Sequence, residues 1–326
     1  MKQSLFEARY QEQWAAFENT LQQLERRDRA TQEHGHFSQR YRQLCNHLAL
    51  AQERHYSSHL IDRLRHLALR GHQQLYRQRA RPASSIAAFI LRGFPRQVRA
   101  NRGVVLGAFA ALFGTLVLVA LLVRVWPDLV YSVLAPDKVS EMEQMYDASQ
   151  SHLGRAADRA STEDWMMFGF YIMNNIGIAF QTFASGLLLG LGSLFYLFYN
   201  GLQIGAVAGH LSGTPAGVPF WSFVIGHGAF ELTAIALAGA AGLRLGWALV
   251  APGRLSRGTA LRLAAAQALQ LVYGVALFLL MAAFLEAYWS SKGSIAPAIK
   301  FAVGAVLWIL VIAYLCLAGR GEHEPG

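Results

Sequence analysis

The pattern of hydrophobic and polar positions changes near residue 103. Before that point, apolar side chains recur every three or four residues among polar ones, as at Trp14, Phe17 and Leu21. This spacing places them on one stripe of an amphipathic helix. Residues 1–82 therefore predict a small helical hairpin or bundle, built from two or three such helices.

From residue 103 onward, long uncharged runs alternate with short charged segments. Residues 103–123 carry no charge, and at about 1.5 Å per residue this run crosses the ~30 Å of membrane hydrocarbon. Residues 165–230 contain 66 positions without Asp, Glu, Lys or Arg, enough for two crossings and the start of a third. We predict six transmembrane helices, at about 103–125, 165–188, 192–211, 219–243, 263–285 and 297–317. A re-entrant pair within 165–211 is the alternative.

A basic segment, residues 83–102, joins the two regions. Its arginines are Arg92, Arg96, Arg99 and Arg102, and its apolar side chains include Phe89, Ile90 and Phe94. This composition is typical of a helix in the membrane interface, with arginines among anionic lipid headgroups and aromatic rings below them. We predict an interfacial elbow helix that leads into the first crossing.

Charge is distributed unevenly along the chain. Residues 1–102 hold 18 Lys and Arg against 8 Asp and Glu, whereas residues 127–164 hold 3 against 8. Lys and Arg near the ends of membrane helices remain in the cytoplasm. We therefore expect an extracytoplasmic loop at 127–164 and cytoplasmic termini, including the tail 319–326. The basic charges are scattered and accompany no recognition motif, so no nucleic-acid partner is expected.

Polar side chains fall inside the predicted membrane helices. The candidates for an intramembrane polar core are Asn174, Asn175, Asn200, His227 and Glu231, with His210 as a further member. His227 and Glu231 are four residues apart and therefore share one helix face. An ionised carboxylate is costly in hydrocarbon. We expect these residues to satisfy one another in the interior.

Three roles for this core stay open. The core locks the helices in register, or it lines an ion or proton path, as intramembrane ionisable residues often do. A metal or hydrolase site is the third. It is disfavoured because His-Gly-x-x-Glu supplies two ligands, with His210 as a candidate third, and lacks the second histidine of H-E-x-x-H. We expect no metal, no cofactor and no catalytic residue.

Small residues repeat at four-residue spacing at Gly201, Gly205 and Gly209. Such spacing lets helices approach closely in lipid. Gly242 and Gly246, after Ala238, continue the pattern on the following predicted helix, and Gly228 beside His227 also lets another backbone approach. We expect these glycines to mediate helix packing, either within one chain or between the copies of a homo-oligomer.

The chain resembles the stage II sporulation protein M family of integral membrane proteins over roughly residues 85–315. The resemblance rests on "MNNIGIAFQTFASGLLLGLGSLFYLFYNGLQIGAVAG" and "GHGAFELTAIALAGAAGLRLG". Within them, Asn174 and Asn175, the Asn200–Gly201 pair, and His227 with Glu231 carry the pattern. Gly226 stands where the family usually has a proline. The front end, with "LRGHQQLY", is similar to Gram-negative members.

The resemblance implies a non-enzymatic, multi-pass protein of the bacterial inner membrane that works through partners. In spore formers the named member is implied to act in engulfment with peptidoglycan-degrading enzymes, but nothing in this sequence identifies a sporulating host. We expect a homo-oligomeric scaffold or assembly partner of a cell-envelope complex, whose partners are cell-envelope or membrane proteins. A transporter or channel that uses the polar core is the alternative.

Overall fold

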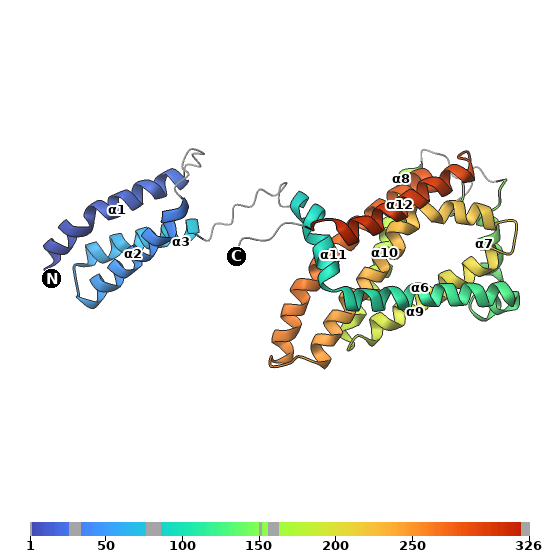
Figure 1. Ribbon diagram of the computed structural model, residues 1–326, viewed down its shortest axis with the longest axis horizontal. Helices are drawn as coiled ribbons and strands as arrows, with labels where there is room; N and C mark the ends of the chain where they lie inside the picture. Colours follow the sequence, from blue (N-terminus) through green and yellow to red (C-terminus); the bar gives the residue numbers. More distant parts are fainter. Residues whose placement is uncertain (1, 26–33, 76–85, 150–151, 156–162, 321–326) are drawn as a thin grey trace. The chain divides into compact units, whose positions relative to one another are not determined.

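The computed structural model of the protein describes residues 2–25, 34–75, 86–149, 152–155 and 163–320. Every regular element in these ranges is a helix, which confirms the all-α class (Figure 1). The chain divides into two compact units, Met1–Ser84 and Ser85–Gly326. The predicted boundary between residues 82 and 83, and the tail beyond residue 320, lie outside the described residues.

The first unit consists of three helices, α1 (Gln3–Glu25), α2 (His34–Glu53) and α3 (Ser58–Leu75). The apolar stripe of α1 is buried against apolar side chains of the other two helices. The core residues of the unit are Phe6, Trp14, Phe17, Leu21, Phe37, Leu44, Ala51, Leu60, Leu64 and Leu67. The period of three to four residues read from the sequence thus corresponds to the buried face of α1.

His47 is a buried polar member of this core. The indole nitrogen of Trp14 donates a hydrogen bond to its Nδ1 at 3.2 Å. Burial lowers the pKa of His47, because the charged imidazolium is poorly solvated there. The neutral ring therefore serves as a hydrogen-bond acceptor that fixes Trp14 between α1 and α2.

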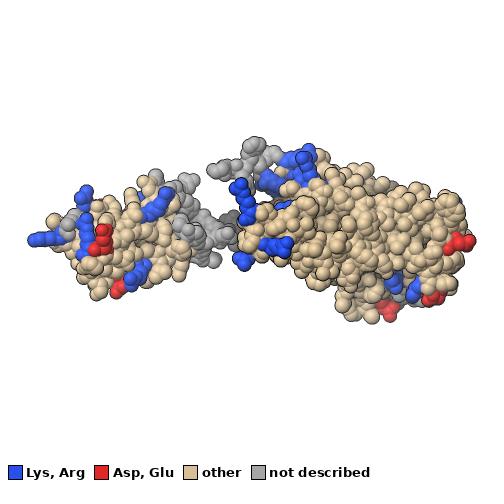
Figure 2. Space-filling view, turned by 90° about the horizontal axis from the view of Figure 1, so that it is seen from below, with Lys and Arg blue, Asp and Glu red and all other residues tan. Residues whose placement is uncertain are grey.

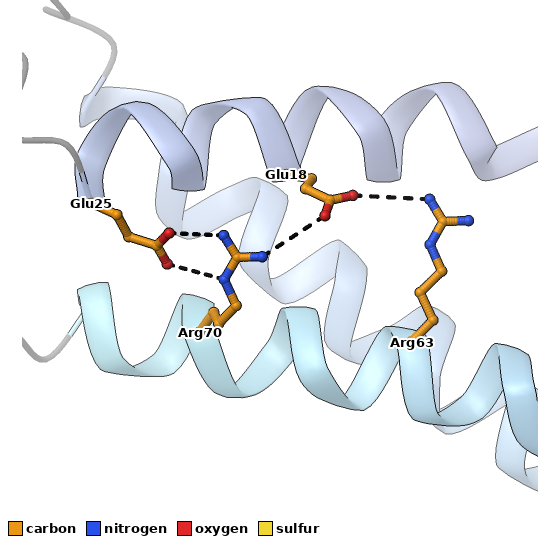
Figure 3. Close-up of polar contacts among 4 residues, drawn as sticks. All are labelled: Glu18, Glu25, Arg63 and Arg70. Carbon is orange, nitrogen blue, oxygen red and sulfur yellow. Dashed lines mark hydrogen bonds and ion pairs between the residues drawn. The ribbon is translucent and has the colours of Figure 1, made fainter.

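Ion pairs connect α1 to α3 (Figure 3). Arg70 donates to both carboxylate oxygens of Glu25, from Nε at 3.0 Å and from Nη2 at 2.8 Å. Glu18 lies 3.8 Å from Arg70 and 4.0 Å from Arg63. The hydrogen bond from Arg70 lowers the pKa of Glu25. Glu18 and Glu25 are seven residues apart on α1, and their partners Arg63 and Arg70 are seven residues apart on α3, in the same order. The two helices are therefore parallel, and these pairs fix their register.

The second unit contains the remaining helices, most of them apolar. They are α5 (Phe94–Ala100), α6 (Arg102–Val125), α7 (Pro136–Met145), α8 (Asp164–Ala184), α9 (Leu191–Leu211), α10 (Gly217–Val250), α11 (Arg257–Leu285) and α12 (Pro297–Leu317). Short π-helical turns, Phe89–Gly93 and Glu286–Ser290, precede α5 and extend α11. Four helices in the described residues are long and apolar enough to cross a membrane: α6, α10, α11 with its extension, and α12.

Helices α8 and α9 have 21 residues each but are not among these four. Both carry amide side chains, which lower their hydropathy. A tight turn joins them through the 3₁₀ segment Ser185–Leu187 and Gly190, whose φ of 86° favours glycine. The sequence marks this turn only weakly, and the structure places it directly between two helices.

The connection between α10 and α11 is shorter than the sequence predicts. The arginines of this region predict a cytoplasmic loop over residues 244–262, but the structure continues both helices and leaves only residues 251–256 between them. Arg244 on α10 donates from Nε to the side-chain oxygen of Gln267 on α11 at 2.8 Å. Because this hydrogen bond gives the Arg244 guanidinium a polar partner, α10 continues past the arginine to Val250.

The elbow packs against protein, which corrects the prediction that Phe94 dips into lipid. Phe94 is fully buried, and its ring meets that of Phe278 edge to face at 5.5 Å. It also lies directly over Gly274, where any Cβ would overlap the ring. The Tyr314 hydroxyl donates a hydrogen bond to the Ile90 carbonyl. The elbow is therefore anchored on α11 and α12.

Two arginines of the elbow cap the end of α12. Arg99 donates to the carbonyl oxygens of Leu315 at 2.9 Å and Ala318 at 2.7 Å, and Arg96 donates to that of Gly319 at 2.9 Å. The last carbonyls of a helix have no partner within it and carry partial negative charge. These guanidinium groups, predicted to lie among lipid headgroups, satisfy those carbonyls. They also hold the start of α6 close to the end of α12.

The opposite end of the second unit holds the described part of the acidic segment (residues 127–164) and the connections that precede α10 and α12 (Figure 1). The amide of Leu153 donates to the carbonyl of Ser291 at 2.6 Å, and the ring of Tyr146 contacts that of Phe220 at 5.2 Å. Figure 2 shows acidic side chains at this end, a group of basic ones at the elbow end, and a broad surface with little charge between them.

Candidate functional site

The site begins with the pair that the sequence places on one face of α10. His227 is 4% exposed, and its Nε2 lies 3.9 Å from a carboxylate oxygen of Glu231 one turn later. The ring of Phe223 meets the imidazole edge to face at 4.9 Å. The four-residue spacing thus produces the shared helix face, and the bundle encloses it.

Residues at the end of α11 complete the pair from the other side. In the π-helical turn Glu286–Ser290, the Ser290 hydroxyl lies 3.1 Å from Nδ1 of His227. The ligand atoms of His227, Glu231 and Glu286 all lie within 4.8 Å of one another. One imidazole and two carboxylates therefore converge, and such a group can hold a cation, share protons or lock the two helices together.

A lysine from α12 reaches the same turn. Lys300 is 2% exposed, and its ammonium donates to the carbonyl of Ser290 at 2.7 Å. Lysine is rarely buried unless it is paired. Here it places one positive charge beside a residue that contacts His227, and it ties α12 to the end of α11.

The neighbouring asparagines of α8 lie next to this group. Asn175 is buried and adjacent to Glu231, whereas Asn174 is on the exposed face of α8. Nδ2 of Asn174 donates to Oδ1 of Asn175 at 2.9 Å. Nδ2 of Asn175 lies against Glu231 but makes no hydrogen bond of normal geometry to any described residue. Asn175 thus belongs to the cluster directly, and Asn174 only through Asn175.

Two predicted members of the core have other partners. The amide of Asn200 donates to the Tyr196 carbonyl of its own helix at 2.7 Å. Nε2 of His210 lies 2.8 Å from Glu143 of α7, in the acidic segment. The prediction of His210 as a candidate third ligand beside His227 is wrong, because the end of α9 directs its ring to that segment. Glu286 takes the third position instead.

Sequence reasoning did not identify Glu286, Ser290 and Lys300. The predicted fifth crossing ends at residue 285, which assigns Glu286 to a loop, and the sixth begins at 297 without marking Lys300. One signal was present: a glutamate and a lysine each directly beside an apolar run. Their convergence on His227 depends on how α10, α11 and α12 pack, which spacing along one helix cannot reveal.

The glycines predicted to mediate packing have distinct neighbours. A Cβ at Gly201 would lie 2.7 Å from the Leu112 carbonyl oxygen, and one at Gly205 would lie 2.6 Å from that of Leu116. Gly209 faces Ala120 in the same way. This stripe of α9 therefore packs against α6 of the same chain, and the matching order of contacts makes the two helices parallel (Figure 1).

Gly242 and Gly228 differ from each other. A Cβ at Gly242 would overlap the Ser193 hydroxyl and lie 2.6 Å from the Phe183 carbonyl, so Gly242 packs α10 against α8 and α9. A Cβ at Gly228 would approach only Val224 and Leu232, which belong to its own helix. The assignment of Gly228 to helix packing is therefore a misprediction.

Apolar helices with a buried polar interior define the class of this protein, a helical membrane protein. The chain matches the family described as stage II sporulation protein M over residues 103–291, and it belongs to that family. Residues 4–77 match a domain of unknown function, DUF8413. Searches of curated proteins and of solved structures found no match to the chain. The family match covers α6 to the end of α11, and hence His227, Glu231 and Glu286.

Proposed function

We propose that the chain crosses the inner membrane of a bacterium six times, through α6, α8, α9, α10, α11 and α12, with both termini in the cytoplasm. The contacts at the elbow support an even number of crossings, since the start of α6 and the end of α12 lie together. Because α6 and α9 pack in parallel, the chain has to return once between them, which supports a crossing by α8. Helices α8 and α9 are each about 30 Å long, which suits a crossing.

The distribution of charge supports the same orientation. The basic elbow and the arginines near the α10–α11 connection lie at one end of the second unit, and the acidic segment lies at the other (Figures 1 and 2). Lys and Arg mark the cytoplasmic side. In this orientation the cluster around His227 lies toward the extracytoplasmic side of the bundle, because α10 enters from that side.

We infer that the protein acts without catalysis, as a scaffold or assembly partner of a cell-envelope complex. The observation that carries this proposal is the use of polar groups to join helices in the second unit. Ser193 of α9 donates to the Thr182 carbonyl of α8 at 2.6 Å, and Lys300 of α12 donates to the turn after α11. Together with backbone contact at Gly201 and Gly205, these bonds make a rigid platform.

Self-association is part of this proposal. The glycine stripe on α9 packs within the chain. Helix α6 carries glycines of its own, on a face that does not contact α9. A Cβ at Gly103, Gly107 or Gly114 would have no atom of the described chain within 4 Å. Small residues on a free face allow a second helix to approach closely. A second copy of the chain or a membrane partner would fit this face of α6.

Transport is the second candidate function, and one observation favours it. His227, Glu231, Glu286 and Lys300 place four ionisable side chains in the interior of the unit. Ionisable groups at membrane depth often mark ion or proton paths. In this alternative the cluster would exchange protons or ions with the extracytoplasmic side.

Replacement of Glu231 by Gln separates the two functions. If the protein is a scaffold, Glu231→Gln should reduce the oligomer fraction or lower the stability by about 1–3 kcal/mol, because the amide disturbs a buried polar cluster. No flux should depend on this residue. Cross-linking in native membranes and proton flux into proteoliposomes measure the two effects. Glu143→Gln, in the acidic segment, is the matched control and should change neither.

A variant that assembles and is as stable as the wild type, but has lost a proton-linked flux, would refute the scaffold. Loss of assembly in Glu231→Gln, together with the absence of any measurable flux in the wild type, would refute transport.

A further inference from the structure

We propose that His227, Glu231 and Glu286 form a binding site for one divalent transition-metal ion. The site would lie between α10 and the turn that follows α11. This proposal does not depend on the scaffold role, because an ion at this place would serve a structural or a transport function equally well.

The first support is the convergence of the three donors. Nε2 of His227 lies 3.9 Å from Oε2 of Glu231, and the ligand atoms of all three residues lie within 4.8 Å of one another. Nitrogen and oxygen ligands bind Zn²⁺ at about 2.0–2.2 Å, so ligands of one ion lie within about 4 Å of each other. Small side-chain rotations would therefore bring the three donors onto a common ion.

The second support is the orientation of the imidazole. Nδ1 of His227 lies 3.1 Å from the Ser290 hydroxyl, which leaves Nε2 toward Glu231. A histidine ligand typically uses its second nitrogen in a hydrogen bond that fixes the ring. Ser290 is itself held by Lys300, which binds its carbonyl at 2.7 Å. The ring is thus oriented as a ligand would be.

The third support is independent of the donors and comes from α8. Asn175 is 2% exposed and its amide lies against Glu231, but its Nδ2 makes no hydrogen bond of normal geometry in the described part of the chain. Rotating the amides of Asn174 and Asn175 by 180° keeps the hydrogen bond between them. That rotation exchanges Nδ2 of Asn175 for its carbonyl oxygen. Asn175 would then present an oxygen to the ion as a fourth ligand.

The donor set decides the class of ion. Two carboxylates beside an imidazole in a low-dielectric interior gain most from a divalent cation, which balances both charges. Imidazole with carboxylates suits Zn²⁺ and Mn²⁺, whereas Ca²⁺ and Mg²⁺ prefer oxygen ligands alone. Zn²⁺ is the appropriate probe, with Mg²⁺ as the competitor that should not displace it.

The test uses the full chain in lipid nanodiscs, stripped with a chelator and dialysed against Zn²⁺. Bound zinc is measured by mass spectrometry as a function of free zinc. We expect one tight site per chain in the wild type and in Glu143→Gln. We expect zinc binding to be at least about 100-fold weaker in Glu286→Gln. Loss of a metal ligand lowers the affinity at least as much as loss of a residue that only hydrogen-bonds to a ligand. Ser290→Ala should weaken binding about 10–100-fold.

Absence of a tight site in the wild type would overturn the proposal, and so would equal affinity in Glu286→Gln. Besides His227, ten of the 11 histidines and the 2 cysteines of the chain can bind zinc elsewhere. X-ray absorption at the zinc edge of the wild type resolves this, even if Glu286→Gln fails to fold. One imidazole with oxygen ligands supports the site, whereas sulfur or several imidazoles contradict it.

Discussion

Leucine in place of Gly205 is expected to force α6 and α9 apart and to lower the free energy of unfolding by about 3 kcal/mol. A Cβ at this position would already lie 2.6 Å from the carbonyl oxygen of Leu116 and 3.0 Å from Cβ of Val119. The nearest atom belongs to backbone, which cannot rotate away as a side chain can. The whole helix must move, and Gly201 and Gly209 would lose their contacts as well.

Gly177→Leu is the matched control for this substitution. Gly177 lies within α8, and a Cβ there would meet no atom of the described chain within 4 Å. Unfolding by heat or by dodecyl sulfate, followed by circular dichroism, measures both variants. The control should change stability by less than about 1 kcal/mol. Equal loss in both variants would mean that the close contact of α6 and α9 is not what stabilises the bundle.

Alanine in place of Phe94 is expected to cost about 3 kcal/mol and to release the elbow from the bundle. The Phe94 ring is fully buried between Gly274, Phe278 and Tyr314. Because Gly274 has no side chain to fill the space, a cavity remains. The same unfolding assay measures the loss, and proteolysis near Arg92 reports on the release of the elbow.

Leu91→Ala provides the comparison for Phe94→Ala. Leu91 lies three residues earlier in the elbow and is 61% exposed. If Phe94 lay in lipid, as the sequence alone suggests, both substitutions would have similar small effects. A small effect of Phe94→Ala would therefore restore the interfacial interpretation of the elbow.

The helices of the membrane unit were largely predictable. The helix bounds predicted at 103–125, 192–211 and 297–317 agree with α6 (Arg102–Val125), α9 (Leu191–Leu211) and α12 (Pro297–Leu317), and of these α6 and α12 are long and apolar enough to cross a membrane. Hydrocarbon thickness sets a minimum length for an uncharged run, and arginine, glycine and proline mark its ends. Arginine was a less reliable marker of a helix end at α10, where Arg244 is hydrogen-bonded to Gln267 and the helix continues to Val250.

The candidate site was predictable only within one helix. The four-residue spacing of His227 and Glu231 is enough to place them on one face. Glu286 lies 55 positions beyond Glu231, and its approach depends on the packing of two helices and on the turn that follows α11. The elbow arginines present the same difficulty, because their partners are carbonyls at the far end of the chain.

The orientation of the second unit in the membrane decides which side of the membrane the polar cluster of His227, Glu231 and Glu286 lies near. Reporter insertions measure it directly, with a fluorescent protein that folds in the cytoplasm and a phosphatase that is active outside it. An insertion after Ser256, between α10 and α11, should be fluorescent and lack phosphatase activity. An insertion within residues 141–150 should show phosphatase activity and no fluorescence. The reverse pattern, or the same side for both insertions, would contradict six crossings with cytoplasmic termini.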